Sequence, residues 1–177
     1  MGVLQLLSIR PVRRRWTQAL SRIAIAAAMA ASDALSLASQ IPPSDSAPGR
    51  LVDVGGYRLH MFCRGSAPSG GPTVVLSAGS GDLAIDWWRV QAALADSSRV
   101  CAYDRAGSGW SDLGPEPRTL RQEAAELDLL LKRAGERGPY VLVGHSLGAQ
   151  VVRLYQAEHP REVVGMVLVA PTHETHG

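Results

Sequence analysis

Short apolar runs alternate with amphipathic segments along most of this 177-residue chain. Residues 51–54 and 57–63 have strand character and flank Gly55-Gly56, a dipeptide typical of a two-residue β-hairpin turn. The later apolar runs are short and rich in β-branched or aromatic residues, which indicates further strands. These runs lie at residues 73–76, 99–103, 140–143 and 163–169.

Two of the amphipathic segments have the spacing of helices. Residues 85–94 place Ile85, Trp88 and Ala92 on one side of a predicted helix. A second helix is predicted over residues 149–158, and the proline that follows would end it.

A third helix lies between these two, and its start is marked in the sequence. Thr119 and Gln122 form a capping box, in which side chains satisfy the free N–H groups of a first helical turn. Gly135 and Gly138 end the segment. Its apolar residues recur at helical spacing and are Leu120, Ala124, Leu127, Leu130, Leu131 and Ala134.

The predicted order is a hairpin followed by alternating strands and helices. Strands that are apolar throughout are typical of a parallel sheet covered on both faces. We therefore expect an α/β fold, with a mostly parallel sheet, an N-terminal antiparallel hairpin and helices on both faces. Right-handed crossover connections then set the winding.

The formal net charge of +2 comes from the N-terminal segment. Five arginines precede the first acidic residue, Asp33, and beyond residue 38 the remaining 13 basic residues face 15 acidic ones. No run of Lys or Arg follows residue 22, and no basic patch is interleaved with aromatics. The composition therefore argues against nucleic acid as a partner.

Residues 1–38 have the pattern of a signal peptide or a membrane anchor. Arginines precede nine apolar residues at 23–31, and small residues follow, so that cleavage after Ala30 or Ala38 is expected. The run is shorter than the roughly 20 residues that a spanning helix needs, which favours a cleaved signal. A retained anchor, with Asp33 at the membrane interface, is one alternative, and a cytoplasmic amphipathic helix is another. A cleaved signal would leave the following domain secreted or periplasmic, and a retained anchor would hold it outside the cytoplasm, so the domain is exported in both cases. Residues 39–49, rich in proline, form a linker to a domain at residues 50–177.

A G-x-S-x-G motif at residues 144–148 joins an apolar strand to a helix. This is the setting of a nucleophile elbow, which exposes a serine at a tight turn. Gly144 and Gly148 let neighbouring backbones approach without a Cβ clash. Ser146 would then lie at a helix N-terminus, where backbone N–H groups point toward a developing oxyanion.

This motif and two others make the chain resemble the α/β-hydrolase fold family over residues 50–170. The resemblance is to serine hydrolases of the AB hydrolase-1 type. Residues 77–81 (S-A-G-S-G) stand in the place of the family's His-Gly-x-Gly oxyanion loop, with Ala78 instead of the histidine. Residues 103–111 match the family's D-R-x-G-x-G-x-S loop. The resemblance covers only the N-terminal portion of the family's fold.

The resemblance implies a role for each matched residue. Ser146 would be the nucleophile, and the backbone N–H groups of Ser80 and Leu147 would form the oxyanion hole. His145 would pack beside the elbow, because a residue directly before the nucleophile points away from its Oγ. The predicted role of Asp104 and Arg105 is structural, in holding the loops near the elbow.

The family's catalytic acid and histidine follow later strands, and the chain stops eight residues after Val169. The cap and last strands are therefore expected to be absent, leaving a truncated core. The chain would be a fragment or a short protein without the second half. His173 in the short tail is a weak alternative base, and residues 172–174 would border the site. We also expect the last strand to have a bare edge and an uncovered apolar face, which favours aggregation.

The family's strand order makes the strands of Cys63 and Cys101 neighbours. A cross-strand disulfide is conceivable in an exported protein, but we expect two buried, reduced thiols. No spacing of His, Cys and Asp indicates a metal, and no G-x-G-x-x-G opens a helix, so no cofactor is expected.

Two functions are compatible with the sequence. The first is hydrolysis of an ester, thioester or similar acyl bond of a small molecule through a Ser146 acyl-enzyme. By family resemblance, a serine nucleophile argues against the dehalogenase and epoxide-hydrolase branches, which use Asp. The second is a catalytically silent scaffold or binding protein that keeps the fold and associates with a membrane through residues 1–38.

Overall fold

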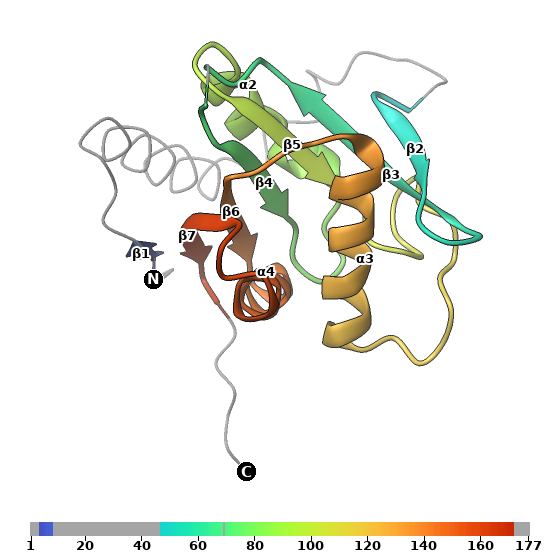
Figure 1. Ribbon diagram of the computed structural model, residues 1–177. Helices are drawn as coiled ribbons and strands as arrows, with labels where there is room; N and C mark the ends of the chain where they lie inside the picture. The colour runs from blue at the N-terminus through green and yellow to red at the C-terminus, as the bar shows by residue number, and fades with distance from the viewer. Residues whose placement is uncertain (1–3, 9–46, 69, 172–177) are drawn as a thin grey trace.

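The computed structural model of the chain describes residues 4–8, 47–68 and 70–171 (Figure 1). Most of the predicted leader and linker, and the tail residues Thr172, His173, Glu174 and His176, lie outside these residues. Among the described residues, no helix has the length and apolar character that crossing a membrane requires.

The described residues form one seven-stranded sheet in the order β1-β7-β6-β4-β5-β3-β2. Strands β4, β5, β6 and β7 pair in parallel, whereas β1, β2 and β3 pair antiparallel with their neighbours. The strands are β1 (Leu4–Ser8), β2 (Arg50–Asp53), β3 (Arg58–Arg64), β4 (Thr73–Ser77), β5 (Arg99–Tyr103), β6 (Tyr140–His145) and β7 (Val163–Val169). The predicted mostly parallel sheet with an N-terminal hairpin is confirmed.

The helices follow the predicted order. They are the 3-10 helix η2 (Ala84–Trp87), α2 (Trp88–Ala95), α3 (Leu120–Ala134) and α4 (Leu147–Glu158). At the start of α3 the Thr119 hydroxyl accepts a hydrogen bond from the Gln122 N–H at 3.2 Å, as the capping box predicts. Gly135 ends the helix in a left-handed conformation.

Helices cover both faces of the sheet, as expected (Figure 1). On one face α3 and α4 pack their apolar residues, such as Leu127 and Val152, against alternate residues of the strands. On the other face η2 and α2 contribute Trp87, Val90 and Leu94 to a second cluster. The prediction of which side of the first helix is buried is wrong. Ala92, which was placed on the apolar side, is exposed, while Trp87 and Val90 are buried.

The outer edge of β7 is paired, so the expectation of a bare edge is wrong. Residues Leu4–Ser8 run antiparallel to β7, with Leu4 opposite Val169 and Ser8 opposite Gly165. Residues 165–169 of β7 are also buried, so its apolar face is covered. Pairing satisfies backbone groups that a bare edge would offer to other chains. The strand that does this belongs to the segment predicted as a leader.

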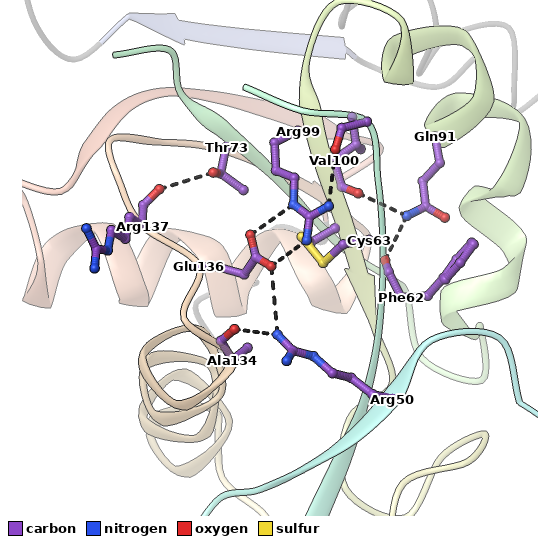
Figure 2. Close-up of a disulfide and its surroundings, with 12 residues drawn as sticks. Arg50, Phe62, Cys63, Thr73, Gln91, Arg99, Val100, Ala134, Glu136 and Arg137 are labelled. Atoms are coloured by element: carbon purple, nitrogen blue, oxygen red, sulfur yellow. Dashed lines mark hydrogen bonds and ion pairs between the residues drawn. A yellow bond between two sulfur atoms is a disulfide. The ribbon is translucent and has the colours of Figure 1, made fainter. Parts of the chain in front are cut away.

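Cys63 and Cys101 form a disulfide, so the expectation of two reduced thiols is also wrong. The two residues lie directly opposite each other on β3 and β5, with their Cα atoms 4.0 Å apart. Figure 2 shows Glu136 beside the disulfide, where its carboxylate is 2.7 Å from the Arg99 guanidinium. Residues 38 apart in the sequence are thus joined across two sheet neighbours.

Removing β1 should convert the β7 edge into a site of self-association. A chain lacking residues 1–8 would expose a seven-residue edge strand with no charge and no proline, V-V-G-M-V-L-V. We expect sedimentation velocity to show oligomers that grow with protein concentration, whereas the full chain stays smaller. Adding Val164→Lys to the shortened chain should suppress them, because a charged edge resists pairing. A shortened chain that sediments like the full chain at every concentration would contradict this role of β1.

Opening the disulfide should lower the free energy of unfolding by about 2–4 kcal/mol, because a closed loop of this length restricts the unfolded chain. The measurement is urea denaturation of the protein with and without a phosphine reductant. The control is the Cys63→Ser, Cys101→Ser double variant, whose lower stability should not respond to reductant. Free thiols in the untreated protein, detected by alkylation and intact mass, would show that the bond does not form.

Candidate active site

Ser146 occupies the turn between β6 and α4 in a backbone conformation that non-glycine residues rarely adopt. Its φ is 49° and its ψ is −117°. The Ser146 N–H donates to the carbonyl of Val169 at the end of β7, at 3.1 Å, which ties the turn to the sheet. A strained, half-buried serine between a strand and a helix has the geometry of a nucleophile elbow.

The two glycines of the motif are required by close contacts between backbones. A Cβ on Gly144 would lie 2.5 Å from the Cα of Ala149, inside the first turn of α4. A Cβ on Gly148 would lie 2.3 Å from the Ser77 carbonyl oxygen at the end of β4. Neither contact leaves room for a side chain, so α4 can start directly above the sheet only with glycine at both positions.

The start of α4 brings the two proposed oxyanion donors to the same end of the sheet. Gly148 packs on the backbone of Ser77 and Ala78, which leads directly into the loop that holds Ser80. Within the described residues, no protein group accepts a hydrogen bond from the N–H of Ser80 or of Leu147. Both donors are therefore available to a ligand, and Leu147 lies where the helix dipole favours negative charge.

Arg105 holds the loop that precedes Ser80. Its guanidinium is buried and donates to the carbonyl of Ala78 and, at 2.6 Å, to that of Gly79. Since C=O and N–H point in opposite directions in a trans peptide, fixing the Gly79 carbonyl also fixes the direction of the Ser80 N–H. Glu123 lies 3.6 Å from the Arg105 Nε, and burial raises the pKa of this carboxyl although neighbouring guanidinium groups oppose the shift.

Asp104 joins β3, η2 and the loop after β5 through a fully buried carboxylate. It accepts hydrogen bonds from the N–H of Ala84 at 2.7 Å and of Trp110 at 3.2 Å, and it pairs with Nδ1 of His60 at 2.8 Å. A Cβ on Gly109 would lie 2.3 Å from this carboxylate. These contacts fit the predicted structural role of Asp104, because its oxygens already have partners among loop backbones and His60.

His60 is fully buried beside Asp104 and titrates abnormally. Burial disfavours its charged form, but hydrogen bonds to Asp104 and to the Pro48 carbonyl outweigh this and raise the pKa of His60 above its ordinary value. This histidine belongs to none of the sequence motifs. The signal that it is buried was its place between Leu59 and Met61 in an apolar strand.

His145 points to a carboxylate that sequence reasoning did not single out. Its Nδ1 lies 2.9 Å from Oδ2 of Asp82, and the same oxygen accepts the N–H of Gly79 at 3.2 Å. In the part of the chain that the structure describes, no histidine or carboxylate hydrogen-bonds the Ser146 hydroxyl. His173, the alternative base, lies outside that part.

One side-chain grouping away from the elbow has the composition of a metal site. Asp128, His159 and Glu162 bring ligand atoms within 4.8 Å of one another. However, the Lys132 ammonium already lies 2.7 Å from Asp128, so a metal ion would meet a competing positive charge. Among the described residues the other such grouping contains the two disulfide cysteines, whose sulfurs are bonded to each other. The absence of a metal site stays a prediction.

Comparison with known proteins places this geometry in a family. A sequence model of the family described as "alpha/beta hydrolase fold" matches residues 69–177. The uncharacterized protein YqjL of Bacillus subtilis is 38% identical over 103 residues, which are 58% of this chain and 41% of that protein. The probable transporter efuK of Hormonema carpetanum is 37% identical over an alignment of 126 residues that covers 67% of this chain and 18% of that protein.

A solved structure has a similar arrangement. Wild-type Cfl2 from Burkholderia cenocepacia superposes with a TM-score of 0.59 and 35% identity, over 64% of this chain and 38% of the Cfl2 chain. The present chain therefore spans less than half the length of each of these proteins.

The buried His60–Asp104 pair should make stability depend on pH. The raised pKa means that the folded chain keeps a proton that the unfolded chain releases near its ordinary value of about 6.5. His60 thus stabilises the fold fully below that pH, and the contribution is lost as pH rises through the folded pKa. Urea denaturation from about pH 6 upward should show this decline in the wild type but not in His60→Asn, which cannot take the charge. Equal slopes in the two proteins would contradict the assignment.

Proposed function

The chain belongs to the α/β hydrolase fold family and is a hydrolase by family, and from this premise we propose that it is a serine hydrolase acting on acyl bonds. In this proposal Ser146 is the nucleophile, and the substrate is a small molecule with an ester, thioester or similar acyl group. The observation that carries the proposal is the strained turn at Ser146. It lies at the start of α4, next to the N–H of Leu147, which has no protein partner among the described residues.

The proposed reaction forms and breaks bonds in two stages. The Oγ of Ser146 attacks the carbonyl carbon, and the carbonyl π electrons move to the oxygen, which the N–H groups of Ser80 and Leu147 stabilise. The tetrahedral intermediate collapses, the leaving group departs with a proton, and an acyl-enzyme remains. Water then attacks the acyl-enzyme and releases the acid. The proton of Ser146 must pass to a base, which the described residues do not place beside Oγ.

A second candidate is a silent scaffold that binds an acyl compound without turning it over. One observation favours it: within the described residues, no base contacts the Ser146 hydroxyl. A nucleophile without a base retains the oxyanion donors and therefore still binds a carbonyl or an anion at α4.

Export is part of the proposal. The disulfide between Cys63 and Cys101 suits an oxidising compartment, since the cytoplasm keeps thiols reduced. Residues 1–38 would direct the chain there. An anchor that associates with the membrane would keep β1 paired with β7, whereas cleavage of a signal would remove β1 and expose that edge.

The test is covalent labelling with a fluorophosphonate probe, with the adduct located by mass spectrometry. We expect labelling at Ser146 that is lost in Ser146→Ala and after heat denaturation, because only the folded turn presents the hydroxyl to the oxyanion donors. Ser80→Ala is the matched control: it removes a serine hydroxyl but keeps the backbone N–H, so labelling should persist. A protein with native circular dichroism and no adduct would leave the silent scaffold as the function.

A further inference from the structure

A carboxylate oxygen of Asp82 bridges the elbow and the oxyanion loop. Oδ2 is 2.9 Å from Nδ1 of His145, the residue before the nucleophile, and 3.2 Å from the N–H of Gly79, the residue before Ser80. One atom therefore connects the two segments that must stay aligned if an oxyanion is to be bound between them. We refer to His145, Asp82 and Gly79 as the strap.

The strap and Arg105 together hydrogen-bond polar groups of two consecutive peptides. In the Ala78–Gly79 peptide, the carbonyl is bound by Arg105 and the N–H by Asp82. In the next peptide the Gly79 carbonyl is bound by Arg105 at 2.6 Å, and within the described residues the Ser80 N–H has no protein partner. Three of the four polar groups are thus fixed, and the fourth is the proposed oxyanion donor.

Gly79 is glycine because of the strap. It is not among the glycines with a positive φ, so its backbone does not require glycine. A Cβ at this position would lie 2.5 Å from Oδ2 of Asp82 and 2.8 Å from Nδ1 of His145. The His145–Asp82 pair therefore rests directly on the loop backbone, where a side chain would push it away.

We propose that His145 and Asp82 are positioning residues, which hold the oxyanion loop against the elbow and aim the Ser80 N–H at the reacting oxygen; this rests on the proposed serine hydrolase function. The two side chains are 40% and 41% exposed, so water screens their attraction and the pair adds little to the free energy of unfolding. The pair acts on the alignment of the oxyanion loop with the elbow, and catalysis by preorganised donors is sensitive to such alignment.

The first experiment measures the second-order rate of fluorophosphonate labelling at Ser146. Asp82→Ala and His145→Ala should each slow it by roughly tenfold or more, since losing one aligned oxyanion donor costs about 100-fold or more in rate. His145→Asn should recover part of the rate, because its side-chain N–H can take the place of Nδ1. Asp86→Ala is the control: it removes the same charge from an exposed carboxylate nearby that contacts the Leu83 N–H instead of the strap, and should label as fast as wild type.

The second experiment needs no reaction. In ¹⁵N NMR spectra the wild-type His145 ring should carry its proton on Nδ1, and in Asp82→Ala the proton should move to Nε2. The Gly79 amide should exchange with solvent at least tenfold faster in the same variant, while Asp86→Ala leaves both signals unchanged.

The outcomes separate the two proposals. Unchanged tautomer and exchange in Asp82→Ala would overturn the strap, whether or not Ser146 reacts. Labelling at the wild-type rate in folded Asp82→Ala and His145→Ala would overturn its positioning role. If wild-type Ser146 is not labelled at all, the serine hydrolase proposal fails and the strap cannot position a reaction, while the NMR data still decide whether it holds the loop.

Discussion

Three backbones approach one another more closely around Ser146 than side chains would allow. The end of β6, the first turn of α4 and the end of β4 meet there, and a Cβ on Gly144 or Gly148 would fall within 2.5 Å of a backbone atom. This contact sets where α4 starts, and α4 in turn packs with α3 on one face of the sheet. The positive φ of Ser146 is the strain that the close packing imposes on the one residue at the apex.

Loops without regular structure are held beside this turn by buried polar groups. Asp104 accepts the backbone N–H groups of Ala84, at the start of η2, and of Trp110, and it contacts the His60 ring. Arg105 donates to two carbonyls of the loop after β4. A buried charge without partners costs several kcal/mol, so each of these groups selects the loop conformations that satisfy it. Because the hydrogen-bonding atoms of Asp104 and Arg105 are already engaged with these partners, neither residue is free to act on a substrate.

The two sides of the sheet are completed by segments from the N-terminal part of the chain. On one side, β1 pairs with the outer edge of β7. At the opposite side, the β2–β3 hairpin forms the other edge of the sheet, and the Cys63–Cys101 bond joins β3 to the parallel strand β5. Both features depend on which strands become neighbours, and strand order is a property of the whole chain.

Local patterns in the sequence are sufficient for the hairpin, the apolar strands, the Thr119 cap and the turn at Ser146, because each depends on residues a few positions apart. The side of α2 that is buried was predicted wrongly, since the 3-10 turn at Ala84–Trp87 rotates the helix relative to a regular α-helical pattern. Four other features join residues that are 38 or more positions apart in the sequence. They are the disulfide, the pairing of β1 with β7, the buried contact of His60 with Asp104 and the contact of Asp82 with His145. Such contacts are decided only when the sheet forms, because packing and strand order, which no local pattern encodes, bring these groups within bonding distance.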